Sequence, residues 1–176
     1  MQAFLPPLRP PGALAEKDFI KRCVRCGQCV TICPHKSIIL PSFLGRHRGQ
    51  PIIDPHKKPC YLCMLCPPSC PTGALDPTLS DLTRVRMGQA YIAKDRCHNY
   101  AQTGIMCMTC YDRCPLRGQA VVLAMGLNPH MTTACVGCGI CVYVCPVAAV
   151  TVVPAHASWI PPFAEQIKPS PRKGEG

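Results

Sequence analysis

The sequence is poor in acidic and aromatic residues, and it has no apolar run of membrane-spanning length. It contains nine Asp and Glu residues, five Tyr, four Phe and a single Trp. The most apolar stretch, residues 139–153, is shorter than the roughly 20 residues that a membrane helix needs. Pro146 lies in its middle, where proline would break a helix because it lacks an amide donor and clashes with the preceding turn. We therefore do not expect this stretch to span a membrane.

The motifs of common enzyme and nucleotide sites are also missing. We find no phosphate-binding glycine loop, no dinucleotide-binding glycine motif and no nucleophile paired with a base. An aromatic-plus-basic motif for binding nucleic acid is absent as well. The sequence thus indicates no catalytic residue, no small-molecule substrate of its own and no nucleic-acid partner. Whether the chain takes part in an enzyme depends on the complex in which it works.

The N-terminal residues carry no export signal. The segment MQAFLPPLRPPGAL has no charged n-region, no apolar h-region and no twin-arginine pair. We therefore expect the chain in the cytoplasm or at the cytoplasmic face of a membrane. The alternative is the periplasm, if a signal has been removed.

Cysteine, in contrast, is abundant, and the sixteen cysteines fall into four groups of four. The groups are Cys23, Cys26, Cys29 and Cys33; Cys60, Cys63, Cys66 and Cys70; Cys97, Cys107, Cys110 and Cys114; and Cys135, Cys138, Cys141 and Cys145. Three groups have the spacing C-x2-C-x2-C-x3-C, and the third differs only in a first interval of nine residues. Proline follows the last cysteine of every group. This is the spacing of bacterial iron–sulfur proteins.

Two other uses of cysteine fit the pattern less well. A short secreted chain with so many cysteines is typically a disulfide scaffold, but disulfides do not require tight groups of four. Structural zinc takes two C-x2-C pairs or mixed Cys and His ligands, and not a third cysteine three residues further on. Sixteen thiolates provide four ligands for each of four 4Fe–4S clusters, with none left over.

The formal net charge of +10 has a local explanation. Each oxidised cluster with its four thiolates contributes a charge of about 2−, so four of them leave about +2 for the loaded protein. Much of the excess of Lys and Arg therefore compensates the clusters. The remainder suits an acidic partner or an anionic membrane face.

The repeat of cysteine groups predicts an α+β fold with two tandem ferredoxin-like modules. Strand-like segments precede three of the groups, a short apolar run follows each group, and this alternation is how a bacterial two-cluster ferredoxin is built. We predict a first module over residues 17–77 and a second over residues 90–154, joined by a linker over residues 78–89 that contains a short helix near Ser80 or Asp81. Extended Pro-rich arms, residues 1–16 and 155–176, complete the chain.

The fourth cysteine of each group, in two-cluster ferredoxins, binds the cluster of the other group. Carried over within each module, this rule assigns Cys23, Cys26, Cys29 and Cys70 to cluster one; Cys60, Cys63, Cys66 and Cys33 to cluster two; Cys97, Cys107, Cys110 and Cys145 to cluster three; and Cys135, Cys138, Cys141 and Cys114 to cluster four. A rival pairing joins the first group with the fourth and the second with the third. Adjacency in the sequence favours the former.

Several residues beside the ligands have predicted roles. Gly27, Gly137 and Gly139 lie where the backbone must approach a cluster closely. His35 and His98 lie near ligands, but the cysteines already fill every site, so we do not expect either to bind iron. The nine inserted residues of the third group are either a tolerated loop or a cover or partner contact for cluster three.

The two arms have apolar side chains on stiff Pro-rich backbone, among them Leu8, Trp159 and Phe163. Stiffness lowers the cost of ordering a segment, and a buried Trp is a frequent binding hot spot. We predict that the arms lie on a neighbouring subunit or on the other face of the clusters, and that they clamp the chain onto a larger redox complex at or near the membrane. The alternative is that both arms are disordered.

The chain resembles the MauM/NapG-type four-cluster ferredoxin subunits over about residues 8–153. The resemblance rests on LRPPGAL, DFIKRCVRCGQCV, PCYLCMLCPPSCPTGAL and RMGQAYIAKDRC, and it includes the stretched third group. It implies an electron-transfer protein that works beside a polytopic membrane partner, the two together oxidising quinol for a terminal reductase. Proteins of this type are exported by a twin-arginine signal, which this sequence lacks. The donor and the acceptor stay open.

Two classes of function follow. In the first, four 4Fe–4S clusters relay single electrons between a membrane quinone module and a redox enzyme. In the second, the chain is an integral electron-transfer subunit of a larger oxidoreductase, beside a molybdenum, tungsten or flavin subunit. The partner that purifies with the chain distinguishes them.

Overall fold

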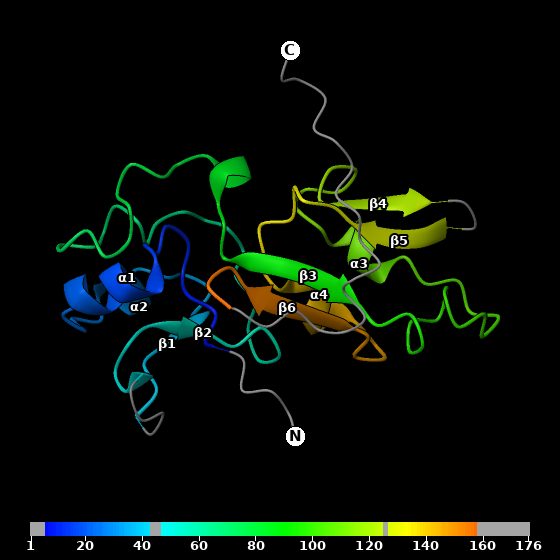
Figure 1. The fold of residues 1–176 in the computed structure, drawn as a ribbon, viewed down its shortest axis with the longest axis horizontal. Coiled ribbons are helices and arrows are strands. Elements are labelled where there is room, and N and C mark those ends of the chain that lie inside the picture. The colour runs from blue at the N-terminus through cyan, green and yellow to red at the C-terminus, as the bar shows by residue number, and fades with distance from the viewer. Residues whose placement is uncertain (1–5, 43–46, 125–126, 158–176) are drawn as a thin grey trace, which may run out of the picture.

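The helices and strands of this protein are short, and long loops connect them. The structure is a computed structural model that describes residues 6–42, 47–124 and 127–157. In chain order the elements are α1 (Glu16–Arg22), α2 (Gln28–Thr31), β1 (Ile38–Ile39), β2 (Ile52–Ile53), the 3-10 helix η2 (Leu82–Arg84), β3 (Gly88–Ile92), α3 (Thr109–Asp112), β4 (Val121–Ala124), β5 (Asn128–Met131), α4 (Ile140–Val144) and β6 (Val150–Pro154). The mixed helix and strand content agrees with the predicted fold class. Figure 1 shows the two modules beside one another, with α1, α2, β1 and β2 in one and α3, α4 and β3–β6 in the other.

The second module is built from two antiparallel strand pairs. The first and last strands of this module, β3 and β6, pair with one another, so that Ile92 lies opposite Val150. The hairpin β4–β5 forms the other pair. Alternate residues of β3 are buried, including Ala90 and Ile92. Such alternation places one face of a strand on the core. The cysteine groups lie between these strands in sequence, as in the predicted ferredoxin arrangement.

The first module has the same plan, but the N-terminal segment supplies one of its strand positions. The strands β1 and β2 form a short antiparallel pair. Ala13, ahead of the first cysteine group, makes an antiparallel bridge to Leu75, which follows the second group. This bridge takes the place that the β3–β6 pair has in the second module. A further bridge joins Leu8 to Ile53.

Two expectations for the N-terminal arm are wrong. The arm is not extended throughout, because residues 11–12 form a turn in which Gly12 has a φ of 78° and the N–H of Ala13 donates to the carbonyl of Pro10. Residues 8–14 also do not lie on a neighbouring subunit, since their bridges place them on the first module of their own chain. Leu8 is only 5% exposed, so it is not available as an anchor on a neighbouring subunit. The helix α1 begins at Glu16, one residue inside the predicted arm. The C-terminal arm from residue 158 onward, with Trp159 and Phe163, lies outside the described residues, and its predicted role stays a prediction.

The linker contains the short helix that the sequence predicts, although β3 begins before the predicted end of the linker. The Asp81 carboxylate accepts a hydrogen bond from the backbone N–H of Thr83 at 2.8 Å and caps η2. The predicted linker extends to residue 89, whereas β3 already begins at Gly88. A Cβ atom on Gly137 would lie 2.4 Å from the backbone N of Gly88, so the glycine lets the fourth cysteine group lie directly on this strand.

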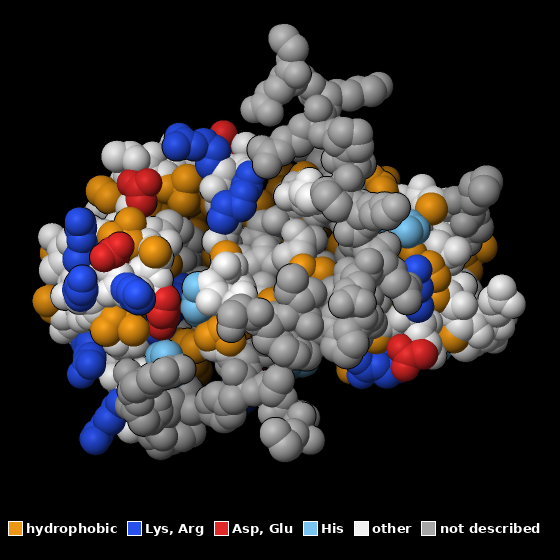
Figure 2. Space-filling model, in the orientation of Figure 1, with side chains coloured by type: hydrophobic (Ala, Val, Ile, Leu, Met, Phe, Trp, Pro, Cys, Tyr) orange, Lys and Arg blue, Asp and Glu red, His pale blue; other side chains and the backbone are white. Residues whose placement is uncertain are grey.

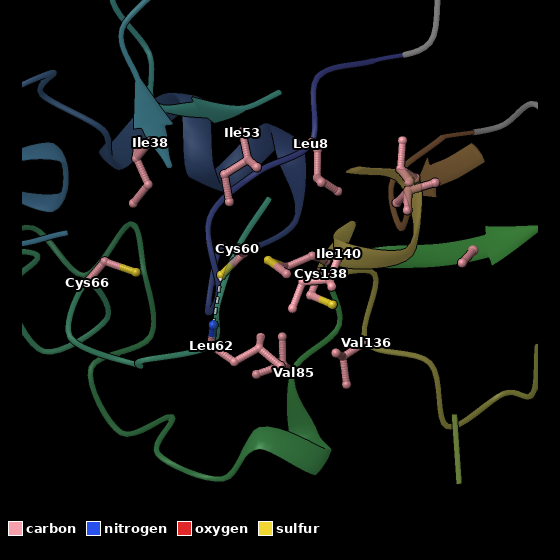
Figure 3. Close-up of a cluster of buried hydrophobic side chains, with 14 of the residues drawn as sticks. Leu8, Ile38, Ile53, Cys60, Leu62, Cys66, Val85, Val136, Cys138 and Ile140 are labelled. Atoms are coloured by element: carbon pink, nitrogen blue, oxygen red, sulfur yellow. Dashed lines mark hydrogen bonds between the residues drawn. The ribbon is translucent and has the colours of Figure 1, made fainter. Parts of the chain in front are cut away.

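Buried side chains form a core that continues across the two modules. Figure 3 shows Leu62 of the first module near Val85 of the linker and Val136 of the second module. Each fully buried side chain of this size contributes roughly 1.5–3 kcal/mol through the hydrophobic effect. In the described ranges, no helix combines the length and the hydropathy needed to cross a membrane.

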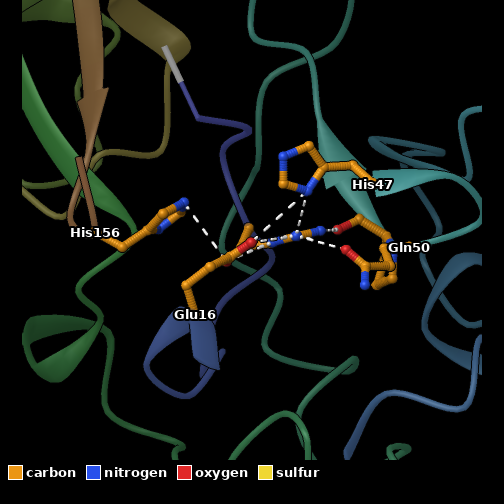
Figure 4. Close-up of polar contacts among 6 residues, drawn as sticks. Glu16, His47, Gln50 and His156 are labelled. Carbon is orange, nitrogen blue, oxygen red and sulfur yellow. Dashed lines mark hydrogen bonds and ion pairs between the residues drawn. The ribbon is translucent and has the colours of Figure 1, made fainter. Parts of the chain in front are cut away.

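A buried polar network ties the N-terminal segment to the first module and reaches the second. The Arg9 guanidinium, 3% exposed, donates to both carboxylate oxygens of Glu16 at 3.0 and 2.6 Å and to Gln50 Oε1 at 2.8 Å. His156, just after β6, places its Nε2 atom 3.6 Å from Glu16 Oε2 (Figure 4). His47 lies on the other side of the carboxylate. The network therefore links residues that are far apart in the sequence.

Candidate iron–sulfur sites

All sixteen cysteines are free thiols, and the fold gathers them into four sets. A set here means cysteines that share a cavity or act on one another electrostatically, as opposed to a group in the sequence. The first set is Cys23, Cys26, Cys29 and Cys70; the second is Cys33, Cys60, Cys63 and Cys66; the third is Cys97, Cys107, Cys110 and Cys145; the fourth is Cys114, Cys135, Cys138 and Cys141.

Each of the first two sets surrounds its own cavity in the first module. The first cavity is lined by the four cysteines of the first set and by Phe19, Ala74 and Leu75. The second is lined by the second set together with Ile38 and Met64. In both cavities the last cysteine of one sequence group joins three cysteines of the other group. Cys29, Cys60 and Cys66 are buried, whereas Cys26 and Cys63 are exposed, so each set has one side toward solvent.

The fourth set surrounds a third cavity, between the strands and short helices of the second module. Its lining adds Ala90, Leu116, Val121 and Ile140 to the four cysteines. Cys110 of the third set lies on the wall of the same cavity, so the third and fourth sets are neighbours.

The third set is defined by the three cysteines whose charges act on Cys110. Burial raises the pKa of Cys110 to about 12, and the charges of the other three members add to this rise. Cys145 comes from the end of α4, and Cys97 and Cys107 flank the long interval of the third sequence group. Residues of the third and fourth groups thus meet in one place.

Burial and mutual repulsion raise the pKa of most of the inner thiols. Burial raises the pKa of Cys29 to about 11 and that of Cys138 to about 12, and in each case nearby thiolates of the same set add to the rise. Buried thiols packed in this way keep their protons unless a cation compensates their charge. The iron of a cluster is such a cation, and its binding releases the protons.

Backbone N–H groups point at several sulfur atoms. The N–H of Ser37 donates to Cys33 Sγ at 3.5 Å, and the N–H of Ala149 donates to Cys145 Sγ at 3.2 Å. Both are donors four residues after the final cysteine of a group. At Cys70, burial raises the pKa, but hydrogen bonds from following residues outweigh it and the pKa is lowered. Donors to sulfur stabilise the thiolate form that binds iron.

Glycines start two of the helices that carry cysteines. Gly27 and Gly139 precede α2 and α4 in a left-handed conformation, with φ of 79° and 82°. Residues with a side chain rarely adopt this conformation. The turn brings the second and third cysteines of the first and fourth groups to the same side of the chain. Gly137 also has a left-handed φ of 75°. The close approach of these three glycines to a cluster stays a prediction.

The inserted loop of the third group is tied to the β4–β5 hairpin. The Asn99 side chain accepts a hydrogen bond from the N–H of Cys107 and donates one to the carbonyl of Leu127, each 2.7 Å long. The Tyr100 hydroxyl donates to the carbonyl of Pro129. Sequence analysis did not single out Asn99, although an amide side chain in a polar loop ahead of a ligand is a frequent local anchor.

The histidines near the cysteines have other contacts. The His35 ring lies 4.5 Å from the ring of Tyr61, and His98 Nδ1 lies 3.0 Å from the hydroxyl of Thr103. Among the described residues, no three His, Cys, Asp or Glu side chains are arranged to hold a single metal ion. The donors are soft cysteine sulfurs spaced around apolar cavities, and such a donor set fits iron–sulfur clusters.

Known iron–sulfur proteins are similar to this chain. The model of the 4Fe-4S dicluster domain matches residues 22–74, and that of the 4Fe-4S binding domain matches residues 129–151. The chain is 40% identical over 161 residues to the methylamine utilization ferredoxin-type protein MauM of Methylobacillus flagellatus, covering 84% of this chain and 68% of that protein. MauM of Paracoccus denitrificans is 36% identical over 161 residues, covering 84% and 71% of the two chains. Ferredoxin-type protein NapG of Haemophilus influenzae is 37% identical over 166 residues, covering 84% and 59%.

Proposed function

Since the chain belongs to the MauM/NapG family of ferredoxin-type iron–sulfur proteins, we propose that it relays single electrons through four 4Fe–4S clusters between a membrane quinone or quinol module and a redox enzyme. The observation that carries the proposal is the presence of four complete sets of four cysteines in the fold. A protein that only carries electrons between two partners needs one or two clusters. A series of four clusters suits electron transfer between sites that lie far apart.

Each set is proposed to hold one cluster, with the ligands that the sequence predicts. The support is that three sets line separate cavities and that the other three cysteines of the remaining set act electrostatically on Cys110. The dicluster model over residues 22–74 covers both groups of the first module and agrees with two clusters there.

The clusters, when bound, supply reversible one-electron chemistry. The chain contributes the surroundings that set the reduction potential. Reduction makes a cluster more negative. Apolar walls, such as Phe19 and Leu75 at the first set, disfavour this added charge and lower the reduction potential. N–H donors, such as those of Ser37 and Ala149, stabilise the added charge and raise the potential. The balance between the two differs from set to set, which allows four different potentials in one chain.

Two surface features support a contact with larger partners. Exposed cations gather around α1 and α2, and Figure 2 shows Lys and Arg side chains over this end of the molecule. They suit an acidic protein surface or anionic lipid. At the end of the inserted loop, directly before Cys107, Ile105 and Met106 are 56% and 71% exposed. Adjacent apolar side chains at that exposure near the third set suit a protein contact.

The cluster count is tested first. Anaerobically purified protein is expected to contain about 16 iron atoms and as many sulfide ions per chain. An iron content of half this value would contradict the four-cluster relay, and stoichiometric zinc with little iron would contradict an iron–sulfur function altogether.

The partner is tested in detergent-solubilised membranes with a tagged chain. Capture of a polytopic membrane protein, together with bleaching of the visible cluster absorption on addition of quinol, is the expected result. Capture of a molybdenum, tungsten or flavin subunit without a membrane protein would favour the integral-subunit function instead.

A further inference from the structure

The two modules meet at the second and fourth cysteine sets. The backbone N–H of Cys60, in the second set, donates a hydrogen bond to the carbonyl of Cys138, in the fourth set, at 2.9 Å. Both residues are 8% exposed. A candidate ligand of one module is thus hydrogen-bonded directly to a candidate ligand of the other. In agreement with this proximity, the charge of Cys60 is among the causes that raise the pKa of Cys138, after burial.

The packing around this hydrogen bond is apolar and close. Figure 3 shows Cys60 and Cys138 beside Ile140, with Leu62 and Val136 nearby. Next to Cys138, Gly139 lies against Pro55 of the first module, where an added Cβ would come within 2.5 Å of the proline Cβ. The contact between the modules therefore has little room for a change in spacing.

Within each module the two sets are neighbours, because both draw their cysteines from the same two sequence groups. In the first module, Cys29 lines the cavity of the first set, and Cys33, four residues further on, lines that of the second. In the second module, Cys110 of the third set and Cys114 of the fourth set line the same cavity.

From these contacts we infer that the four sets follow one another in the order first, second, fourth, third, and that the Cys60–Cys138 hydrogen bond is the junction between the modules. This order differs from the order of the groups along the sequence, because the fourth set precedes the third. The inference rests on the proposed function, since it requires a cluster in every set. It assigns the first and third sets to the two ends of the series, beside the cationic surface of α1 and α2 and beside the inserted loop.

Loss of one cluster at a time tests the order. Neighbouring reduced clusters broaden each other's electron paramagnetic resonance signals, so a cluster without neighbours gives a narrow, uncoupled signal. The variants C26A, C63A, C107A and C141A each remove one ligand, from the first, second, third and fourth set respectively. In the fully reduced protein, C63A and C141A are expected to show an uncoupled signal of about one spin per chain. C26A and C107A are expected to show none, because they remove an end of the series.

Every other pattern overturns the inference. An uncoupled signal in all four variants would mean that the modules do not interact, and one in none of them would mean a compact arrangement. A signal in C26A or C107A alone would place the first or third set at the junction.

Iron analysis of each variant verifies that a single cluster is missing; where more iron is lost, C33A replaces C63A and C114A replaces C141A. An iron content below about 16 per chain in the parent protein contradicts the proposed function, and not the order.

A pair of glycine variants tests the junction without touching a ligand. Gly139→Ala adds a methyl group that collides with Pro55 across the module boundary. Gly118→Ala is the matched control, because Gly118 has a similar φ of 79° but no atom within 4 Å of the added Cβ. With full iron content in both, Gly139→Ala is expected to narrow the coupled spectrum and Gly118→Ala to leave it unchanged. Equal spectra would overturn the assignment of the junction.

Discussion

Arg9→Met should accelerate unfolding of the loaded protein by about two orders of magnitude. Arg9 is buried, and its guanidinium holds Glu16, Gln50 and the carbonyl of Pro51 while it covers the ring of Phe19 at 4.5 Å. The variant removes the positive charge and leaves all these acceptors without their donor. The N-terminal segment then loses its strongest polar attachment to the first module.

The magnitude follows from the burial of the pair. Removing one partner of a buried ion pair costs about 3–5 kcal/mol. The Glu16 side chain is 22% exposed, so water partly solvates the abandoned carboxylate and the lower end of the range applies. About 3 kcal/mol, at 1.36 kcal/mol per factor of ten, corresponds to an unfolding rate roughly 150-fold higher if the network is already broken in the transition state for unfolding.

The assay follows the visible absorption of the clusters in guanidinium under anaerobic conditions. A rate is measured because unfolding of a protein with bound cofactors is not a simple two-state equilibrium. Lys57→Met is the control, since it breaks an exposed pair with Asp54 that is 3.9 Å long and worth at most about 1 kcal/mol. Replacing both partners, Arg9→Met with Glu16→Leu, should recover part of the loss because no charge is then left unpaired. If Arg9→Met bleaches no faster than Lys57→Met, the reasoning is refuted.

The pH dependence of this effect has a defined sign. Burial raises the pKa of Glu16, but the hydrogen bonds and charge of Arg9, with smaller contributions from His156 and His47, outweigh it and lower the pKa. A lowered pKa in the folded state means that the stabilisation is complete above the unfolded pKa of about 4.3 and is lost only as the pH falls through the folded value. The ratio of the bleaching rates of the parent and Arg9→Met should therefore be the same at about pH 7 and about pH 9.

Three further predictions concern the sites and the partner surface. Cys33→Ser should disturb the cluster of the second set and spare that of the first, as read from Mössbauer and magnetic spectra; loss of the first cluster alone would contradict the crossed ligation. Gly137→Ala, whose Cβ would lie 2.4 Å from the Gly88 backbone, should lower the iron content of the second module, and full iron retention would contradict the close approach. Ile105→Ser combined with Met106→Ser should weaken capture of the membrane partner several-fold at unchanged iron content; unaltered capture would remove the end of the inserted loop from the interface.

The cysteine pattern alone was sufficient to predict the ligand type and the modular repeat. A 4Fe–4S cluster requires cysteines at fixed spacings in the sequence. Groups such as Cys23, Cys26 and Cys29 can therefore be recognised without a structure. The short helices and strands around them were predicted for the same reason. The rule for two-cluster ferredoxins also predicted that the last cysteine of each group joins the other group of its module. The positions of the four sets relative to one another, in contrast, required the fold, because they depend on how the two modules pack.

The N-terminal arm shows where sequence reasoning failed. Its prolines favour an extended chain but do not say which surface that chain covers. Nothing in the sequence distinguishes Arg9 from the other Lys and Arg residues of the chain. Its burial is decided by Glu16, Gln50 and Phe19, which come together only after the first module has formed.

The spatial order of the cysteine sets shows most clearly what the sequence determines and what only the tertiary structure determines. Sequence determines what each group can bind, because the spacing of thiols within a dozen or so residues is a local property. It does not determine which groups face one another, because the contact between Cys60 and Cys138 joins segments 78 residues apart through packing of two separately built modules. Such long-range contacts depend on the shapes of both surfaces at once, and only the tertiary structure contains that information.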